Sequence, residues 1–136
     1  RSGLLFAYCS QAFSDTQNKI KLNEDGILTA EEAQNLALEQ TEMVVLSACE
    51  TGLGKVKNGE GVYGLQRAFQ TAGAKSVLMS LWTVSDEATQ ELMTFFYENW
   101  ITKQMPKRQA FIEAQRQLRV KFPEPYYWGA FVMVGE

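Results

Sequence analysis

The sequence has 136 residues, of which 46% are apolar and 12% aromatic, a composition that suits one globular domain and excludes a disordered chain. Thirteen Lys and Arg against sixteen Asp and Glu leave a net charge of −3, which argues against a broad face that binds nucleic acid directly. No apolar run approaches the roughly 18 residues of a membrane span and no secretory leader is visible, so we expect a cytoplasmic protein with no membrane partner.

The start of the chain indicates a piece of something larger. The first residues, RSGLLFAYC, already have the apolar pattern of a strand, and the sequence contains no histidine. We therefore expect residues 1–136 to be the C-terminal part of a single domain whose N-terminal part is missing. The alternative is a complete domain whose first residues were trimmed.

The N-terminal stretch predicts short elements joined by a polar loop. The apolar run Gly3–Tyr8 is typical of a strand, and Ser10–Glu24 is polar without helical periodicity, which indicates a loop in solvent. Thr29 and Glu32 have the spacing of a capping box, in which a hydroxyl and a carboxylate bond to free backbone amides. We expect the helix that follows to be brief, with Ala33, Leu36 and Ala37 on one face.

The stretch Met43–Trp82 predicts a strand, a helix and a second strand. Met43–Ala48 has two adjacent valines, the mark of a strand buried on both faces, and Ser76–Trp82 is a second apolar run. Between them, four apolar residues recur at helical spacing before a glycine that ends the helix in a left-handed conformation: Val62, Leu65, Phe69, Ala72 and then Gly73. This order predicts two adjacent parallel strands joined by a right-handed crossover.

Two longer helices and a last strand are expected in the C-terminal half. Ser85 has the residue type of a helix N-cap, and acidic residues follow it in the first turn, where the helix dipole favours them. The apolar face of this helix is Leu92, Phe95, Phe96 and Trp100. Lys107–Lys121 predicts another helix, Pro123-Glu124-Pro125 an extended connection, and Gly129–Val134 a buried strand.

Cys49 is the first candidate for chemistry. It comes directly after the strand Met43–Ala48 and opens a glycine-rich loop. Reactive groups of parallel sheets gather at the carboxyl ends of strands, and a glycine loop lets the backbone approach a ligand. Free cysteine is also among the most buried residue types, so a core position remains open from this placement alone. Cys9 ends a short strand and is expected to be structural.

Other chemistries lack their motifs. Val56 follows Gly54-Lys55, so the loop does not match the phosphate-binding pattern G-x-x-x-x-G-K-[ST], and no dinucleotide fingerprint opens a helix directly after the strand. There is no G-x-S-x-G elbow of a serine hydrolase. Without histidine, and with two cysteines far apart, no metal site is expected either. We therefore expect no cofactor and no metal.

Three segments carry a resemblance to a known family. VVLSACETGLG, GEGVYGLQRAFQTAGAKSVLMSLWTVSDEAT and YYWGAFVMVG closely resemble the C-terminal part of CHAT domains, which are caspase-like cysteine peptidases related to separase and often joined to tetratricopeptide repeats. The resemblance implies an α/β fold, a three-layer α/β/α sandwich of caspase-like type with a mostly parallel sheet. It also implies that Cys49 is the nucleophile and that its histidine lies in a His-Gly segment upstream of this chain.

Asp86 is the second candidate. In the separase branch, an acidic residue at the matching place of the L-W-x-V-x-D pattern lies in the pocket for the substrate's P1 side chain and pairs with arginine, and Leu81–Asp86 matches that pattern. A carboxylate paired with a guanidinium supplies both charge and geometry. The alternative is that Asp86 only stabilises the first turn of its helix.

These observations predict part of an intracellular cysteine endopeptidase with a Cys-His dyad that prefers a basic P1 residue. The chain alone should be inactive, because it lacks the imidazole. The alternative is a pseudo-enzyme or protein-interaction scaffold. The expected partners are a protein or peptide substrate, a regulatory partner such as tetratricopeptide repeats, and a second copy that covers the incomplete sheet edge.

Overall fold

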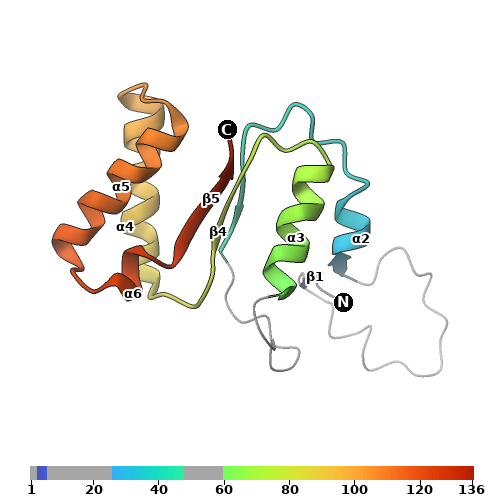
Figure 1. The fold of residues 1–136 in the computed structure, drawn as a ribbon, viewed down its shortest axis with the longest axis horizontal. Coiled ribbons are helices and arrows are strands. Elements are labelled where there is room, and N and C mark those ends of the chain that lie inside the picture. The colour runs from blue at the N-terminus through green and yellow to red at the C-terminus, as the bar shows by residue number, and fades with distance from the viewer. Residues whose placement is uncertain (1–2, 6–25, 48–59) are drawn as a thin grey trace. The chain divides into compact units, whose positions relative to one another are not determined.

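The structure, a computed structural model, describes residues 3–5, 26–47 and 60–136 (Figure 1). The chain divides into two compact units, Arg1–Gln40 with Thr51–Ala74, and Thr41–Glu50 with Lys75–Glu136. Helices and strands occur in both units, so the chain is of the α/β class. In the part of the chain that the structure describes, no helix is both long enough and apolar enough to cross a bilayer.

The first unit contains a small antiparallel ribbon and a capped helical turn. Strand β1 (Gly3–Leu5) pairs with β2 (Ile27–Thr29), and α2 (Ala30–Ala33) follows directly. The predicted capping box is confirmed: the Thr29 backbone N–H donates to Glu32 Oε2 at 2.8 Å, and the Glu32 N–H donates to Thr29 Oγ1 at 3.2 Å. The hydrogen bond from the Thr29 backbone is the main cause that lowers the pKa of the Glu32 carboxyl.

The prediction that Ala33, Leu36 and Ala37 form one buried face of this helix is wrong beyond Ala33. Leu36 and Ala37 lie after the end of α2 and are exposed, while Ala33 is buried. The backbone leaves the helix in tight turns, with Leu36 N donating to Ala33 O at 3.3 Å. A single helical turn has few internal bonds, so a cap can start it but cannot prolong it.

Helix α3 (Glu60–Thr71) forms where the apolar spacing predicted it, and the side chain of Val62, the first residue of the expected face, lies outside the described residues. Its buried residues recur at helical spacing, and they are Leu65, Ala68 and Phe69, followed by Ala72 just beyond the helix. Gly73 has φ +106°, Gly73 N donates to Gln70 O at 3.0 Å, and Ala74 N donates to Phe69 O at 3.1 Å. These bonds form the Schellman end that the glycine predicted.

The second unit is built on a three-stranded sheet of order β3-β4-β5 (Figure 1). Strand β3 (Val44–Leu46) runs parallel to β4 (Ser76–Ser80), with Val44 beside Val77 and Leu46 beside Met79. The predicted adjacency of these two strands is confirmed. The right-handed crossover through α3 stays a prediction, because α3 belongs to the first unit and both strands belong to the second.

Strand β5 (Phe131–Gly135) makes the described sheet mixed. It pairs antiparallel to β4, from Ser76 beside Gly135 to Ser80 beside Phe131. The mostly parallel sheet that was expected is therefore not what these strands form. The reason is that the chain enters β5 at the carboxyl end of β4, where Leu81 N donates to Ala130 O at 2.8 Å.

Burial differs between the two parallel strands. All five residues of β4 are buried, but Val45 in β3 is 38% exposed, so burial of β3 on both faces was a wrong expectation. Val45 lies beside Leu78 in register and projects from the same face, because paired residues of a parallel ladder share a face. The helices over that face cover the central strand more fully than the edge strand. Ala48 lies outside the described residues.

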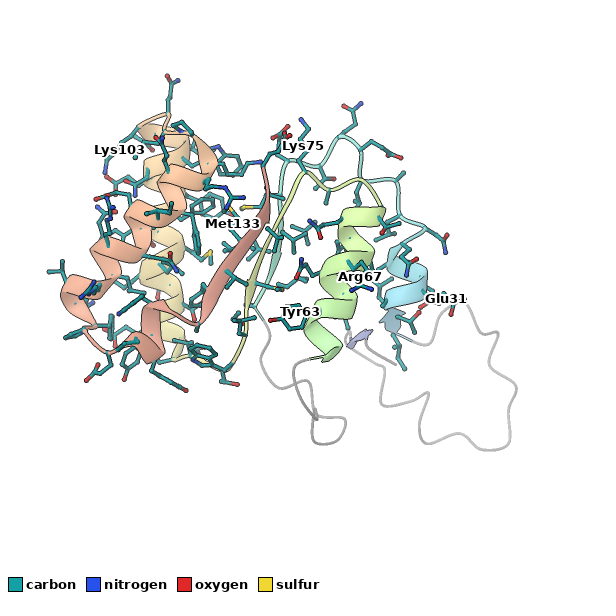
Figure 2. The ribbon with its side chains drawn as sticks, viewed as in Figure 1. Glu31, Tyr63, Arg67, Lys75, Lys103 and Met133 are labelled. Carbon is teal, nitrogen blue, oxygen red and sulfur yellow. The ribbon has the colours of Figure 1, made fainter. Side chains whose placement is uncertain are left out.

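One face of this sheet packs against α4 (Asp86–Tyr97) and α5 (Lys107–Lys121) (Figure 1). Met133 of β5, labelled in Figure 2, packs against their common core. The predicted bounds of α5 and the predicted apolar face of α4 are confirmed. The buried core cluster is Leu78, Leu92, Phe96, Ala110, Phe111, Ala114, Leu118, Ala130 and Phe131.

The helix expected to include Trp100 is present, but its π-helical end and the short helix α6 (Pro125–Trp128) were not predicted. Helix α4 continues as a π-helical segment, η1 (Glu98–Thr102), in which buried Asn99 donates to Gln117 Oε1 and accepts from Lys103 Nζ, each at 2.9 Å. Helix α6 begins at the last residue of the expected extended connection, directly after Glu124, whose backbone is extended as predicted. Proline suits the first position of a helix, since its fixed φ is helical and its missing N–H would have no partner there.

Candidate functional site

A small hollow of about 60 Å³ lies where the two parallel strands end and α4 begins. In open α/β sheets, ligands bind outside the carboxyl ends of strands, so the hollow is at the expected place for a site. Both strands and the helix belong to the second unit. The lining residues are Ser47, Ser80, Thr83, Val84, Asp86, Thr89 and Phe131.

The strand register brings the two serines of the hollow together. The parallel ladder pairs Leu46 with Met79, and Ser47 and Ser80 each follow one residue later. Ser80 is also paired with Phe131 of β5 across the other side of β4. Ser47 is exposed, whereas Ser80 and Phe131 are 5% and 3% exposed. The hollow therefore has a buried floor at the end of β4 and an open side at the end of β3.

Asp86, predicted as a candidate from the sequence, lines this hollow from the first position of α4. Ser85 caps the helix, with its hydroxyl accepting from Ala88 N at 3.3 Å, which confirms the predicted N-cap. The Asp86 side chain is exposed and forms no ion pair with any other residue that the structure describes. Its carboxylate lies where the helix dipole favours negative charge.

Four residues with hydroxyl side chains line the hollow together with Asp86, and sequence reasoning missed them. They are Ser47, Ser80, Thr83 and Thr89. Thr89 Oγ1 donates its proton to Ser85 O at 3.1 Å, which leaves its oxygen able to accept. Oxygen acceptors in the same hollow as a carboxylate suit a cationic group, and Val84 and Phe131 add an apolar wall for an aliphatic stem.

The loop between β4 and α4 is fastened to α6. Trp82 Nε1 donates to Tyr126 O at 2.9 Å, and the Tyr126 hydroxyl donates to Thr83 O at 2.5 Å. The two rings lie 6.3 Å apart between centroids. This pair of bonds holds the loop that carries Thr83 and Val84, so the shape of the hollow depends on α6 as well as on the sheet.

The cysteine part of the predicted site lies outside the described residues. This holds for Cys49, for its neighbours Glu50 and Thr51, and for Cys9. Among the residues that are described, no group of three or more acidic or cysteine side chains is arranged to hold a metal ion.

Comparison with known proteins identifies the family. A family model of the CHAT domain matches residues 1–136. Tetratricopeptide repeat protein 28 of Homo sapiens is 33% identical over 111 residues, which are 80% of this chain and 4% of that protein. The Mus musculus protein of the same name is 32% identical over 111 residues, again 4% of its length, so the chain spans only a small part of these curated relatives. Since the family model covers the whole sequence, the chain belongs to the CHAT domain family.

Proposed function

We propose that the protein carrying this chain is a caspase-like, separase-like cysteine endopeptidase that cleaves after a basic residue. Cys49 is its nucleophile and Asp86 binds the basic P1 side chain. In this proposal the complete domain is a three-layer α/β/α sandwich, works inside the cell and is regulated by attached repeats. The family membership of the chain supports the class of reaction.

The observation that carries the proposal is the Asp86 carboxylate in a hollow at the carboxyl ends of β3 and β4. A guanidinium has five N–H donors and no acceptor, so it needs a carboxylate and further oxygens around it. The hollow offers the Asp86 carboxylate and the hydroxyls of Ser47 and Thr89. No lysine or arginine of the described chain pairs with Asp86, which leaves its charge available to a substrate.

Cys49 stands two residues after Ser47 in the sequence. Two residues of chain span at most about 7 Å, which is the greatest separation that the chain allows between the Cα atoms of Cys49 and Ser47. In the reaction, the thiolate attacks the peptide carbonyl carbon and forms a thioester while the leaving amine takes a proton from the histidine. Water then hydrolyses the thioester. The chain has no histidine, and the proposal takes it from the His-Gly segment of the family.

The pocket role of Asp86 is tested by charge removal in the full-length protein. Asp86→Asn is expected to lower kcat/KM for an arginyl peptide about 10- to 100-fold, since a charge-assisted hydrogen bond contributes about 1.5–3 kcal/mol. Glu87→Gln is the matched control, because Glu87 is the next first-turn acid but pairs with Lys121 and does not line the hollow. Equal effects of the two substitutions would reduce Asp86 to a helix-dipole role.

The nucleophile is tested separately. Cys49→Ala is expected to abolish cleavage of the same peptide, while binding of the uncleaved peptide persists. Cleavage that survives in Cys49→Ala would remove this residue from the mechanism.

A second candidate function is a protein-interaction scaffold without activity. The observation that favours it is the match to proteins named for tetratricopeptide repeats. Peptide binding that depends on Asp86, without cleavage, would select the scaffold. A histidine in a His-Gly segment of the full-length protein, whose substitution stops cleavage, would select the peptidase.

A further inference from the structure

Two large aromatic side chains lie exposed beside the hollow. Trp82 is 40% and Tyr126 54% exposed, and their rings are 6.3 Å apart between centroids with planes 30° apart. We name them the Trp82–Tyr126 pair. Exposure of one large apolar side chain is ordinary, but two in contact next to a candidate site form a surface that a ligand can bury.

The Trp82–Tyr126 pair is held in place before any ligand arrives. The indole N–H of Trp82 donates to Tyr126 O at 2.9 Å, and the Tyr126 hydroxyl donates to Thr83 O at 2.5 Å. The polar atoms of both rings therefore have partners, and what the rings offer to a ligand is their carbon surface. A ligand would lose little affinity to the ordering of these side chains, because they are already fixed.

The pair and the hollow share one loop. Thr83 lines the hollow, follows Trp82 in the chain and accepts the hydrogen bond of Tyr126. Along an extended peptide, residues advance about 3.3 Å each, so a side chain one or two residues from the P1 residue lies about 3–7 Å away from it along the chain. A peptide with its basic side chain beside Asp86 would thus bring a neighbouring side chain to the pair.

We propose that the Trp82–Tyr126 pair is a second specificity site, which binds an apolar side chain one or two residues from the basic residue of the peptide. This inference rests on the proposed function and deepens it. The occupant is a side chain and not a folded partner, because a specific protein interface buries about 800 Å² on each side and two partly exposed rings supply a small part of that area.

The experiment uses the full-length protein with Cys49→Ala, so that peptides bind without cleavage. The probes are acetyl-Ala-Ala-Arg-Ala-Ala-amide and four peptides in which one of its alanines is replaced by leucine. Calorimetry measures each dissociation constant. At least one leucine peptide is expected to bind about tenfold more tightly than the alanine peptide, as burial of its additional carbon atoms against the rings predicts.

Substitutions at Trp82 and Tyr126 test whether their rings cause the gain in affinity of the leucine peptide. Tyr126→Ala is expected to remove most of the gain, and Tyr126→Phe, which keeps the ring and loses the bond to Thr83 O, to keep it. Trp82→Phe, a milder change to the other ring, is expected to reduce the gain in part. Tyr97→Ala is the control, because Tyr97 is 42% exposed on α4 but eleven residues from Asp86, about 16 Å along the helix.

The outcomes separate the two proposals. If Asp86→Asn weakens binding of the alanine peptide but no leucine peptide gains affinity, the second specificity site is overturned and the pocket role stands. If Asp86→Asn leaves binding of every probe unchanged, the pocket role fails, and this inference falls with it. A leucine gain that persists in both Tyr126→Ala and Trp82→Phe would also overturn the inference.

Discussion

Near the start of β4, the carboxylate of Glu42 forms ion pairs with two lysines, Lys75 and Lys107. Lys75, labelled in Figure 2, forms an ion pair with Glu42, and Lys107 donates to Glu42 O at 2.8 Å and to Ser76 Oγ at 3.0 Å. The Lys107 side chain is 10% exposed, and its ammonium also lies 5.3 Å from the centroid of the Trp100 ring. This cluster joins the first turn of α5 to the loop before β3, at the end of the sheet away from the hollow.

The Glu42 cluster predicts a pH dependence of stability. The hydrogen bond from Lys75 lowers the pKa of the Glu42 carboxyl from its ordinary value of 4.5, with burial opposing the shift. A lowered folded-state pKa stabilises the fold above the ordinary value, and this contribution is lost as the pH falls through 4.5 and below. Glu42→Gln should therefore unfold at a lower temperature than the wild type at pH 7, and the difference should shrink on acidification.

Thermal unfolding followed by circular dichroism between pH 7 and pH 3 measures this difference. Glu124→Gln is the control, because Glu124 has no ion pair within the described ranges and should leave the midpoint unchanged at every pH. A gap between wild type and Glu42→Gln that stays constant on acidification would contradict the role of the carboxylate charge.

Local signals made part of the site predictable at the level of single residues. Asp86 and Ser85 could be placed on the first turn of a helix because capping depends on residues three apart in sequence. Ser47 and Ser80 could not be brought together, since they meet through the register of β3 beside β4, which no local pattern specifies. Serine at a strand end is also too common to indicate a site by itself.

The same distinction holds for whole elements. Helix α5 was predictable to the residue, because Pro106 precedes it and its buried residues recur at helical spacing between Phe111 and Leu118. Helix α6 was not, since proline favours both an extended connection and the first turn of a helix, and here the contact of Tyr126 with Thr83 favours the helix. Exposure of Val45 likewise follows from which strand lies at the edge, which the apolar run does not reveal.

Helix α4 gives a prediction about its cap. Ser85→Ala removes the hydroxyl that accepts from Ala88 N, and should lower the free energy of unfolding by about 1 kcal/mol, the usual cost of losing an N-cap. Ser85→Asp, whose carboxylate can accept the same bond, should retain most of the stability. Urea denaturation of the three proteins measures these differences. Equal losses for alanine and aspartate would mean that the hydroxyl bond does not stabilise the helix.

For the whole molecule, the residues proposed to bind the substrate can be distinguished from the residues that catalysis needs. The described part of the chain contains a hollow with a carboxylate, hydroxyls and apolar wall, which suits recognition of a cationic side chain. A thiol nucleophile needs a base as well, and the sequence provides no imidazole anywhere. The proposed peptidase therefore binds its substrate partly through this chain and completes its catalytic dyad through residues that this chain does not contain.

This division predicts the behaviour of the 136-residue chain by itself. General acid–base catalysis contributes about 10²–10⁴ in rate, so the isolated chain should cleave an arginyl peptide at least a hundredfold more slowly than the full-length protein. Circular dichroism and urea unfolding first establish whether the isolated chain is folded. Substitution of the His-Gly histidine in the full-length protein should bring its rate down to a similar level. Cleavage by the isolated chain at the full-length rate, abolished by Cys49→Ala, would show that the thiol needs no imidazole and would refute the dyad.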